Sequence, residues 1–121
     1  MSILITGSSG MLGSAIHRKI RGISSFNEKK ILSPDKKELN LENQNDVLDY
    51  FNNHKIDLVF HAAAKVGGIY ANQIYPGQFL FENLSIQNNL IHFSHEYGVK
   101  HLLFLGSACI YPKYADQPIE E

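Results

Sequence analysis

A glycine-rich turn near the amino terminus constrains the fold more than any other stretch of this sequence. Three apolar residues, Ile3 to Ile5, precede Thr6, and glycines follow at positions 7, 10 and 13. The first glycine permits a tight exit from a strand, the second lets backbone N–H groups approach a phosphate, and the third lets a helix lie close to the sheet. The spacing therefore predicts a buried strand, a phosphate-binding turn and the N-terminus of a helix.

The residues after the turn favour a helix. Apolar side chains recur there at i, i+3, i+4 and i+8, the spacing of one helical face: Leu12, Ala15, Ile16 and Ile20. A short glycine motif is weak evidence on its own, because any glycine-rich turn between a strand and a helix can have this spacing. A turn that binds nothing stays open as an alternative at this point.

Apolar runs alternate with helical patterns along the rest of the chain. We expect strands near residues 3–6, 30–33, 57–61 and 101–105, and further helices near residues 45–53 and 78–97. Strands that alternate with helices form a parallel sheet with right-handed crossovers. We therefore predict a Rossmann-like α/β fold, a doubly wound parallel sheet with strand order 3-2-1-4 and a ligand crevice between strands 1 and 4.

Two local expectations accompany this fold. Residues 66–70 contain two glycines, and we expect them to form a flexible connection. The long helical pattern carries two neighbouring apolar stripes, so we expect that helix to be covered on more than one side. The fourth strand is apolar and lies at a sheet edge in the predicted order, which favours either a truncated parent protein or an edge covered by another copy.

Composition excludes several classes of protein. A length of 121 residues allows one domain at most, and a net charge of −1 with interspersed charges predicts no nucleic-acid or anionic-membrane surface. The single cysteine, Cys109, excludes an internal disulfide and fits a reducing compartment. No apolar run approaches the ~20 residues of a membrane span, and no signal peptide is recognisable, so we expect a cytoplasmic protein. We assign no metal ligands.

The end of the second strand carries residue types that conflict. In dinucleotide folds an acidic residue at this place selects a free ribose 2′-hydroxyl, whereas basic residues accommodate a 2′-phosphate. Here Asp35 stands beside Lys36 and Lys37. All three can equally be solvated charges of a turn.

The ends of the third and fourth strands supply further candidates. Residues 62–64 are alanines, which let a flat ligand lie against the backbone but serve tight helix packing equally well. Ser107 can hydrogen-bond a substrate carbonyl, although a serine after a strand is more often a simple turn residue. Cys109 faces the same way as Ser107 if the chain is extended there, although a lone cysteine is more often a small buried apolar residue.

Two segments resemble a known family far more specifically than the glycine turn does. They are residues 62–79, with the run Ala63-Ala64-Lys65-Val66-Gly67-Gly68-Ile69, and residues 102–118, with the run Gly106-Ser107-Ala108-Cys109-Ile110-Tyr111-Pro112-Lys113. On these residues the chain resembles the GDP-L-fucose synthase family of extended short-chain dehydrogenases/reductases. The resemblance covers essentially all of residues 1–121 and implies an N-terminal, incomplete NAD(P)-binding Rossmann-type domain without the C-terminal substrate domain.

The resemblance implies a reaction on a nucleotide sugar. GDP-4-dehydro-6-deoxy-D-mannose would be epimerised at C3 and C5, whose protons the C4 ketone acidifies, and NADPH would then reduce C4 to give GDP-L-fucose. Ser107 would hold the C4 oxygen, and Cys109 would be one member of the epimerising acid/base pair. The residues that would bind the cofactor are Gly7, Ser8, Ser9, Gly10, Met11, Leu12, Gly13, Lys36, Lys37, Asn40, Leu41, Ala63, Ala64, Leu105 and Gly106.

The sequence departs from the family pattern at two places, which limits the roles that the resemblance implies. Family members often have an arginine in the glycine loop where Ser8 and Ser9 stand, so NAD stays an alternative to NADP. No tyrosine is followed four residues later by a lysine, whereas the family's Tyr-x-x-x-Lys pair protonates the alkoxide. We therefore expect the cofactor-binding part of a homodimeric enzyme that is inactive by itself. The alternatives are another nucleotide-sugar epimerase or reductase, and a non-catalytic dinucleotide-binding module.

Overall fold

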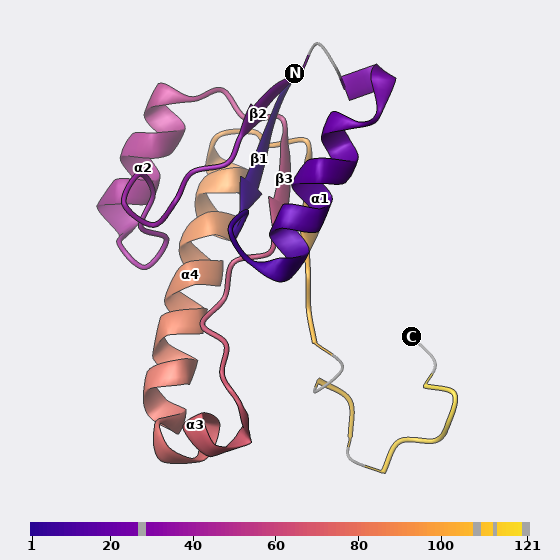
Figure 1. Cartoon of the computed structure of the whole chain (residues 1–121). Coiled ribbons are helices and arrows are strands. Elements are labelled where there is room, and N and C mark those ends of the chain that lie inside the picture. The colour runs from indigo at the N-terminus through magenta and orange to yellow at the C-terminus, as the bar shows by residue number, and fades with distance from the viewer. Residues whose placement is uncertain (27–28, 108–109, 113, 120–121) are drawn as a thin grey trace.

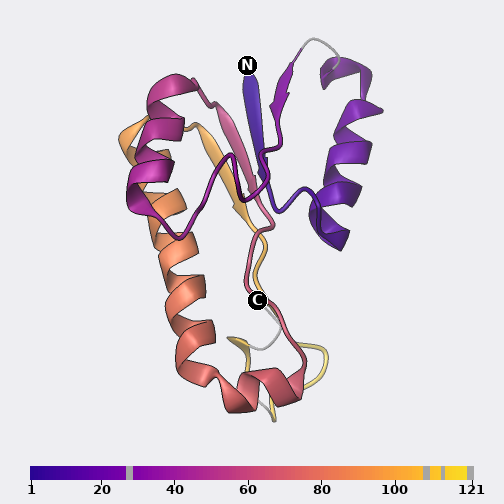
Figure 2. The same cartoon turned by 60° about the vertical axis from the view of Figure 1, so that its left-hand side comes forward.

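The computed structural model describes residues 1–26, 29–107, 110–112 and 114–119, which form one parallel sheet between two layers of helices (Figure 1). In chain order the elements are β1 (Ser2–Thr6), α1 (Met11–Arg21), the 3₁₀ turn η1 (Ser24–Phe26), β2 (Lys30–Leu32), α2 (Gln44–Asn53), β3 (Leu58–His61), α3 (Ile69–Ile74), α4 (Pro76–Glu96) and β4 (His101–Phe104). Figure 2 shows α1 on one face of the sheet and α2 with α4 on the other. The predicted α/β class and parallel sheet are confirmed.

The predicted strand order, 3-2-1-4, is wrong. The sheet has the order β2-β1-β3-β4, so β3 lies beside β1 on the side away from β2. Right-handed crossovers explain this order: α1 covers one face and leads to β2, whereas α2 covers the opposite face and must lead in the opposite direction. The topological switch, where ligands bind in such sheets, therefore lies between β1 and β3. β4 is at an edge, as expected.

Alternation along β1 divides its side chains between two cores. Ile3 and Ile5 face α1 and pack with Ile20. Leu4 faces the other layer, whose larger core contains residues of α2, β3 and α4: Val47, Phe51, Val59, Ile86, Leu90 and Phe93. Fully burying one such side chain stabilises the fold by about 1.5–3 kcal/mol. The two cores fix β1 as the central strand and so fix the turn that follows it.

The helices differ from the sequence predictions in three places. In α1 the buried residues are Gly13 and Ile20, while Leu12 and Ala15 are exposed, because the helix meets the sheet along the line of its glycine. The expected flexible connection contains the start of α3, and the side chain of Asn72 donates to the carbonyls of residues 67 and 68, both at 3.0 Å. In α4 one of the two predicted apolar stripes is exposed, with the residues Leu80, Leu84 and Ile91.

Candidate functional site

The glycine turn is packed so closely that side chains are excluded at two of its positions. Gly7 has a φ of +68°, and a Cβ there would lie 2.7 Å from the backbone of Ala62. A Cβ on Gly13 would lie 2.1 Å from the carbonyl oxygen of Gly7. Gly10 is less crowded, with 3.3 Å to the same oxygen, and its N–H closes the turn by donating to Gly7 O at 3.0 Å. The turn holds β1, the end of β3 and α1 together at backbone distance.

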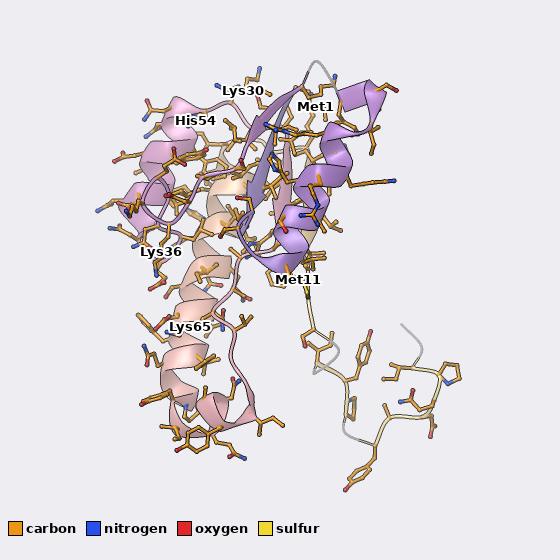
Figure 3. All side chains as sticks on the ribbon, in the orientation of Figure 1. Met1, Met11, Lys30, Lys36, His54 and Lys65 are labelled. Carbon is orange, nitrogen blue, oxygen red and sulfur yellow. The ribbon has the colours of Figure 1, made fainter. Side chains whose placement is uncertain are left out.

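The N-terminus of α1 lies at the carboxyl edge of the sheet, directly after this turn. Its N-cap, Gly10, offers no side-chain cap, and the helical hydrogen bond nearest the N-terminus runs from Ser14 N to Gly10 O at 3.0 Å. The N–H groups of Met11, Leu12 and Gly13 precede that bond and have no acceptor within the helix. Figure 3 shows Met11 at this end of α1. Together with the helix dipole, these amides can bind an anion.

Two cavities meet at the turn. One, of about 290 Å³, lies on the β2 side, and the other, of about 610 Å³, lies on the β4 side. The residues that line both are Gly7, Ser9, Ala63 and Ala64. The larger volume falls within the roughly 300–1,000 Å³ typical of ligand pockets. Because they share a wall, the cavities form one groove along the carboxyl edge, on both sides of the switch between β1 and β3.

The structure brings most of the residues selected from the sequence together in this groove. The β2-side cavity also contains Lys36, Asn40 and Leu41. The β4-side cavity also contains Gly10, Met11, Leu12, Gly13, Leu105, Gly106 and Ser107. Two selected residues are not among those that line the groove. Ser8 donates its hydroxyl to Ser33 O at 3.3 Å, and Lys37 lines a separate hollow between β2 and α2. Cys109 lies outside the described residues.

The charged residues after β2 are divided between two tasks. The carboxylate oxygen Oδ1 of Asp35 accepts the backbone N–H groups of Lys37 at 2.7 Å and Glu38 at 3.0 Å, so Asp35 stabilises its own turn. Lys36 Nζ lies 2.6 Å from Glu42 Oε1, whose hydrogen bond and charge raise the pKa of Lys36. Lys36, and not Lys37, is the cation of this turn that lines the groove.

Comparison with known families agrees with this arrangement. The model of the NAD dependent epimerase/dehydratase family matches residues 3–121. The chain belongs to this family. Among curated relatives, GDP-L-fucose synthase 1 of Arabidopsis thaliana is 50% identical over 119 residues, and the GDP-L-fucose synthase of Escherichia coli (strain K12) is 45% identical over 119 residues. Each alignment covers 98% of this chain but 36% of the relative, so the chain spans about a third of these relatives.

A solved structure shares the fold closely. The GDP-mannoheptose C4 reductase MlghC from Campylobacter jejuni, solved with NADP bound, is 36% identical, with a TM-score of 0.90 over 98% of this chain and 37% of that one. The Rossmann-like assignment and the resemblance to GDP-L-fucose synthases are thereby confirmed. Over the described residues, no helix is long and apolar enough to span a bilayer, and no cluster of His, Cys, Asp and Glu is arranged to hold a metal ion.

Sequence reasoning missed an ion pair and an amide clamp that fix the wall of the groove in this epimerase-family chain. Lys65 Nζ lies 3.0 Å from Glu82 Oε2, and hydrogen bonds from Lys65 and Gln78 lower the pKa of Glu82. The amide of Asn83 accepts from Lys65 N at 2.8 Å and donates to Lys65 O at 3.0 Å. Figure 3 shows Lys65 beside α4. These contacts attach residues 62–65 to α4, a pairing that the separate positions in the sequence do not reveal.

The sequence analysis also missed a buried polar pair beneath the groove. Thr6 Oγ1 lies 2.9 Å from His61 Nδ1, and both side chains are almost fully buried. Burial lowers the pKa of His61 to about 4, so the ring is neutral at pH 7. A signal was present in the sequence, because each of these polar residues ends an otherwise apolar strand.

Proposed function

We propose that this chain is the cofactor-binding part of an NADPH-dependent enzyme that converts GDP-4-dehydro-6-deoxy-D-mannose to GDP-L-fucose. The observation that supports this most is the groove. The glycine turn, the end of β3 and the end of β4 line it in a chain that is 45% and 50% identical to two GDP-L-fucose synthases. Oxidoreductase and isomerase chemistry would both belong to the complete enzyme.

The groove fits a dinucleotide at several points. Gly7 and Gly13 bring the backbone close, and the amides of residues 11–13 offer donors for a pyrophosphate. The residues of the β2-side cavity would hold the adenosine end, and those of the β4-side cavity would hold the nicotinamide end. When bound, the nicotinamide supplies the hydride that reduces a ketone.

In this proposal, two residues that follow β4 in the sequence would act on the sugar. Ser107 lines the β4-side cavity, where its hydroxyl would donate a hydrogen bond to the C4 oxygen as negative charge develops there. Cys109 would exchange a proton at C3 or C5, and the ordinary thiol pKa of about 8.5 suits a proton donor or a moderately activated base. The acid and base that complete the reaction would come from residues that the longer relatives carry beyond this stretch.

NADPH is preferred to NADH in this proposal because of the charges around the β2-side cavity. Asp35 lines the same cavity, but its Oδ1 accepts two backbone N–H groups, so this carboxylate is held in its own turn. Lys36 lines the cavity and can move from Glu42 to a 2′-phosphate. A titration of the 121-residue chain with NADPH and with NADH tests both points. Tighter binding of NADPH is expected, and no binding of either at millimolar concentration refutes the proposal.

A chimera tests the reaction itself. Residues 1–121 would replace the corresponding third of the Escherichia coli GDP-L-fucose synthase, which is 45% identical here. We expect the chimera to form GDP-L-fucose from the 4-keto precursor and NADPH, and the chain alone to bind NADPH without turnover. Cys109→Ser in the chimera is expected to abolish epimerisation, detected as lost solvent-deuterium exchange at C3 and C5. Retained exchange would remove Cys109 from the mechanism.

A second candidate function is reduction at C4 of another GDP-sugar, favoured by the likeness to the Campylobacter jejuni GDP-mannoheptose C4 reductase. A complete protein that is inert with the fucose precursor and active on another 4-keto GDP-sugar would favour it. The complete enzyme is proposed to be a cytoplasmic homodimer, and the exposed apolar side chains of α4 support self-association. Light scattering of the chimera would measure its oligomeric state.

A further inference from the structure

Thr6 and His61 occupy one row across the carboxyl ends of three strands. The parallel register places Thr6 opposite His61, and His61 opposite Phe104, whose ring lies 5.0 Å from the imidazole. The preceding row on the same face is apolar and belongs to the core under α2 and α4: Leu4, Val59 and Leu102. The sheet therefore changes from apolar packing to hydrogen bonding within one pleat, at the edge where the groove begins.

In this row the donor is fixed for the bond from Ala63, whereas the direction of the Thr6–His61 bond depends on the tautomer of His61. Ala63 N donates to Thr6 Oγ1 at 3.3 Å, and Thr6 Oγ1 lies 2.9 Å from His61 Nδ1. A threonine hydroxyl has one hydrogen, and a neutral imidazole has one acceptor nitrogen. One arrangement uses both the hydroxyl hydrogen and the acceptor nitrogen. In it, Thr6 accepts from Ala63 and donates to Nδ1 of His61, and the ring proton is on Nε2. Burial holds His61 in the neutral form that this requires.

The pair also joins the two halves of the groove. Thr6 lines the β2-side cavity, His61 lines the β4-side cavity, and Ala63 lines both. Thr6 directly precedes Gly7, so the hydrogen bonds of its hydroxyl attach the start of the turn to the end of β3 and the residue Ala63 beyond it.

We propose that Thr6 and His61 are positioning residues whose hydrogen bond holds the two halves of the groove, and with them the two ends of a bound dinucleotide, at a fixed separation. This inference rests on the proposed function. It differs from simple core packing, which needs the shape of the two side chains but not the hydroxyl hydrogen.

Variants of the chain distinguish the positioning role from simple core packing in an NADPH titration. Thr6→Val keeps the shape and removes the hydroxyl, Thr6→Ser keeps the hydroxyl, and His61→Phe keeps a ring against Phe104 without its nitrogens. Ser94→Ala is the matched control, because Ser94 is a buried residue of α4 whose hydroxyl has no partner among the described residues. Circular dichroism first confirms that each variant is folded.

Loss of the hydrogen bond is expected to weaken NADPH binding about tenfold in Thr6→Val and in His61→Phe. Thr6→Ser and Ser94→Ala should stay within about twofold of wild type, and the Thr6→Val/His61→Phe double variant should be no weaker than either single variant. Unchanged affinity in folded Thr6→Val and His61→Phe overturns this inference alone. A wild-type chain that binds no dinucleotide refutes the proposed function, and the positioning role with it.

Nitrogen-15 NMR of His61 gives an independent decision even if the variants fail to fold. In the wild-type chain we expect an unprotonated Nδ1 and a protonated Nε2 at pH 7. A protonated Nδ1 would reverse the bond from Thr6 and overturn the inference. An unprotonated Nδ1 that stays coupled to the Thr6 hydroxyl hydrogen supports it.

Discussion

The carboxyl ends of β1 and β4 both reach the groove, but they are determined in different ways. β1 is buried on both faces, and the turn after it admits no side chain at Gly7 or Gly13. β4 lies at an edge with Leu103 and Phe104 nearly half exposed, and a Cβ on Gly106 would meet nothing within 4 Å. Close packing therefore determines the end that would bind the pyrophosphate, whereas the end that would carry the chemistry depends on the identity of its side chains. Substitutions in the turn after β1 should damage folding and cofactor binding together, whereas substitutions after β4 should lower turnover alone.

Alanine substitutions at glycines of the two ends test this contrast most severely. Gly13→Ala places a methyl group 2.1 Å from a backbone oxygen, so it should lower the free energy of unfolding by about 3 kcal/mol or more and abolish NADPH binding. Gly106→Ala should change the free energy of unfolding by less than about 0.5 kcal/mol, because the space is open. Urea denaturation of both variants measures this. Equal destabilisation by the two substitutions would remove the contrast.

Ser107→Ala should lower the rate of turnover. Removing one hydrogen-bond donor to a developing oxyanion typically costs about 100-fold or more in kcat. In the Escherichia coli chimera we expect a loss of that size, while the Kd for NADPH stays close to that of the unsubstituted chimera. A parallel fall in cofactor affinity would show that the β4 end also positions the dinucleotide.

The buried pair between the two ends should make stability depend on pH. His61 has a pKa of about 4 in the folded chain and 6.5 as the ordinary value, so the unfolded chain takes up the proton first as pH falls. Stability is fully present above pH 6.5 and should fall by about 3 kcal/mol between pH 6.5 and 4. His61→Phe should lose this part of the pH dependence, whereas His95→Gln, at an exposed position on α4, should keep it. Urea denaturation at several pH values compares the three proteins.

The same contrast explains how much the sequence predicts. β1 and its turn were predictable because sterics leave few residue types there: three apolar residues, then glycine where φ is +68°. The parallel sheet followed from the alternation of elements. The strand order did not, because it depends on which face of the sheet α2 covers, and an apolar stripe on a helix does not by itself specify that face.

Within the site, proximity along the chain was a poor guide. Lys36 and Lys37 are neighbours, yet only Lys36 lines the groove, since consecutive side chains of the turn point to different hollows. The Lys65–Glu82 ion pair and the Thr6–His61 bond join residues from separate elements. To predict either contact, one must know the register of the sheet or the position of α4. Neither can be read from the residues next to each other in the sequence.

The smallest expected effect concerns the charge at the β2 end of the groove. Lys36 is exposed, so its contact with a 2′-phosphate should contribute about 1 kcal/mol, or roughly fivefold in Kd. Lys36→Ala should therefore weaken NADPH binding about fivefold, leave NADH binding unchanged, and reduce the dependence of NADPH affinity on salt. Lys37→Ala is the comparison, because Lys37 lines the hollow on the other side of the turn. Competition titrations of both cofactors measure the four affinities. If Lys37→Ala weakens NADPH as much as Lys36→Ala does, the 2′-phosphate lies between the two lysines, and the division of charges across this turn is not what selects the cofactor.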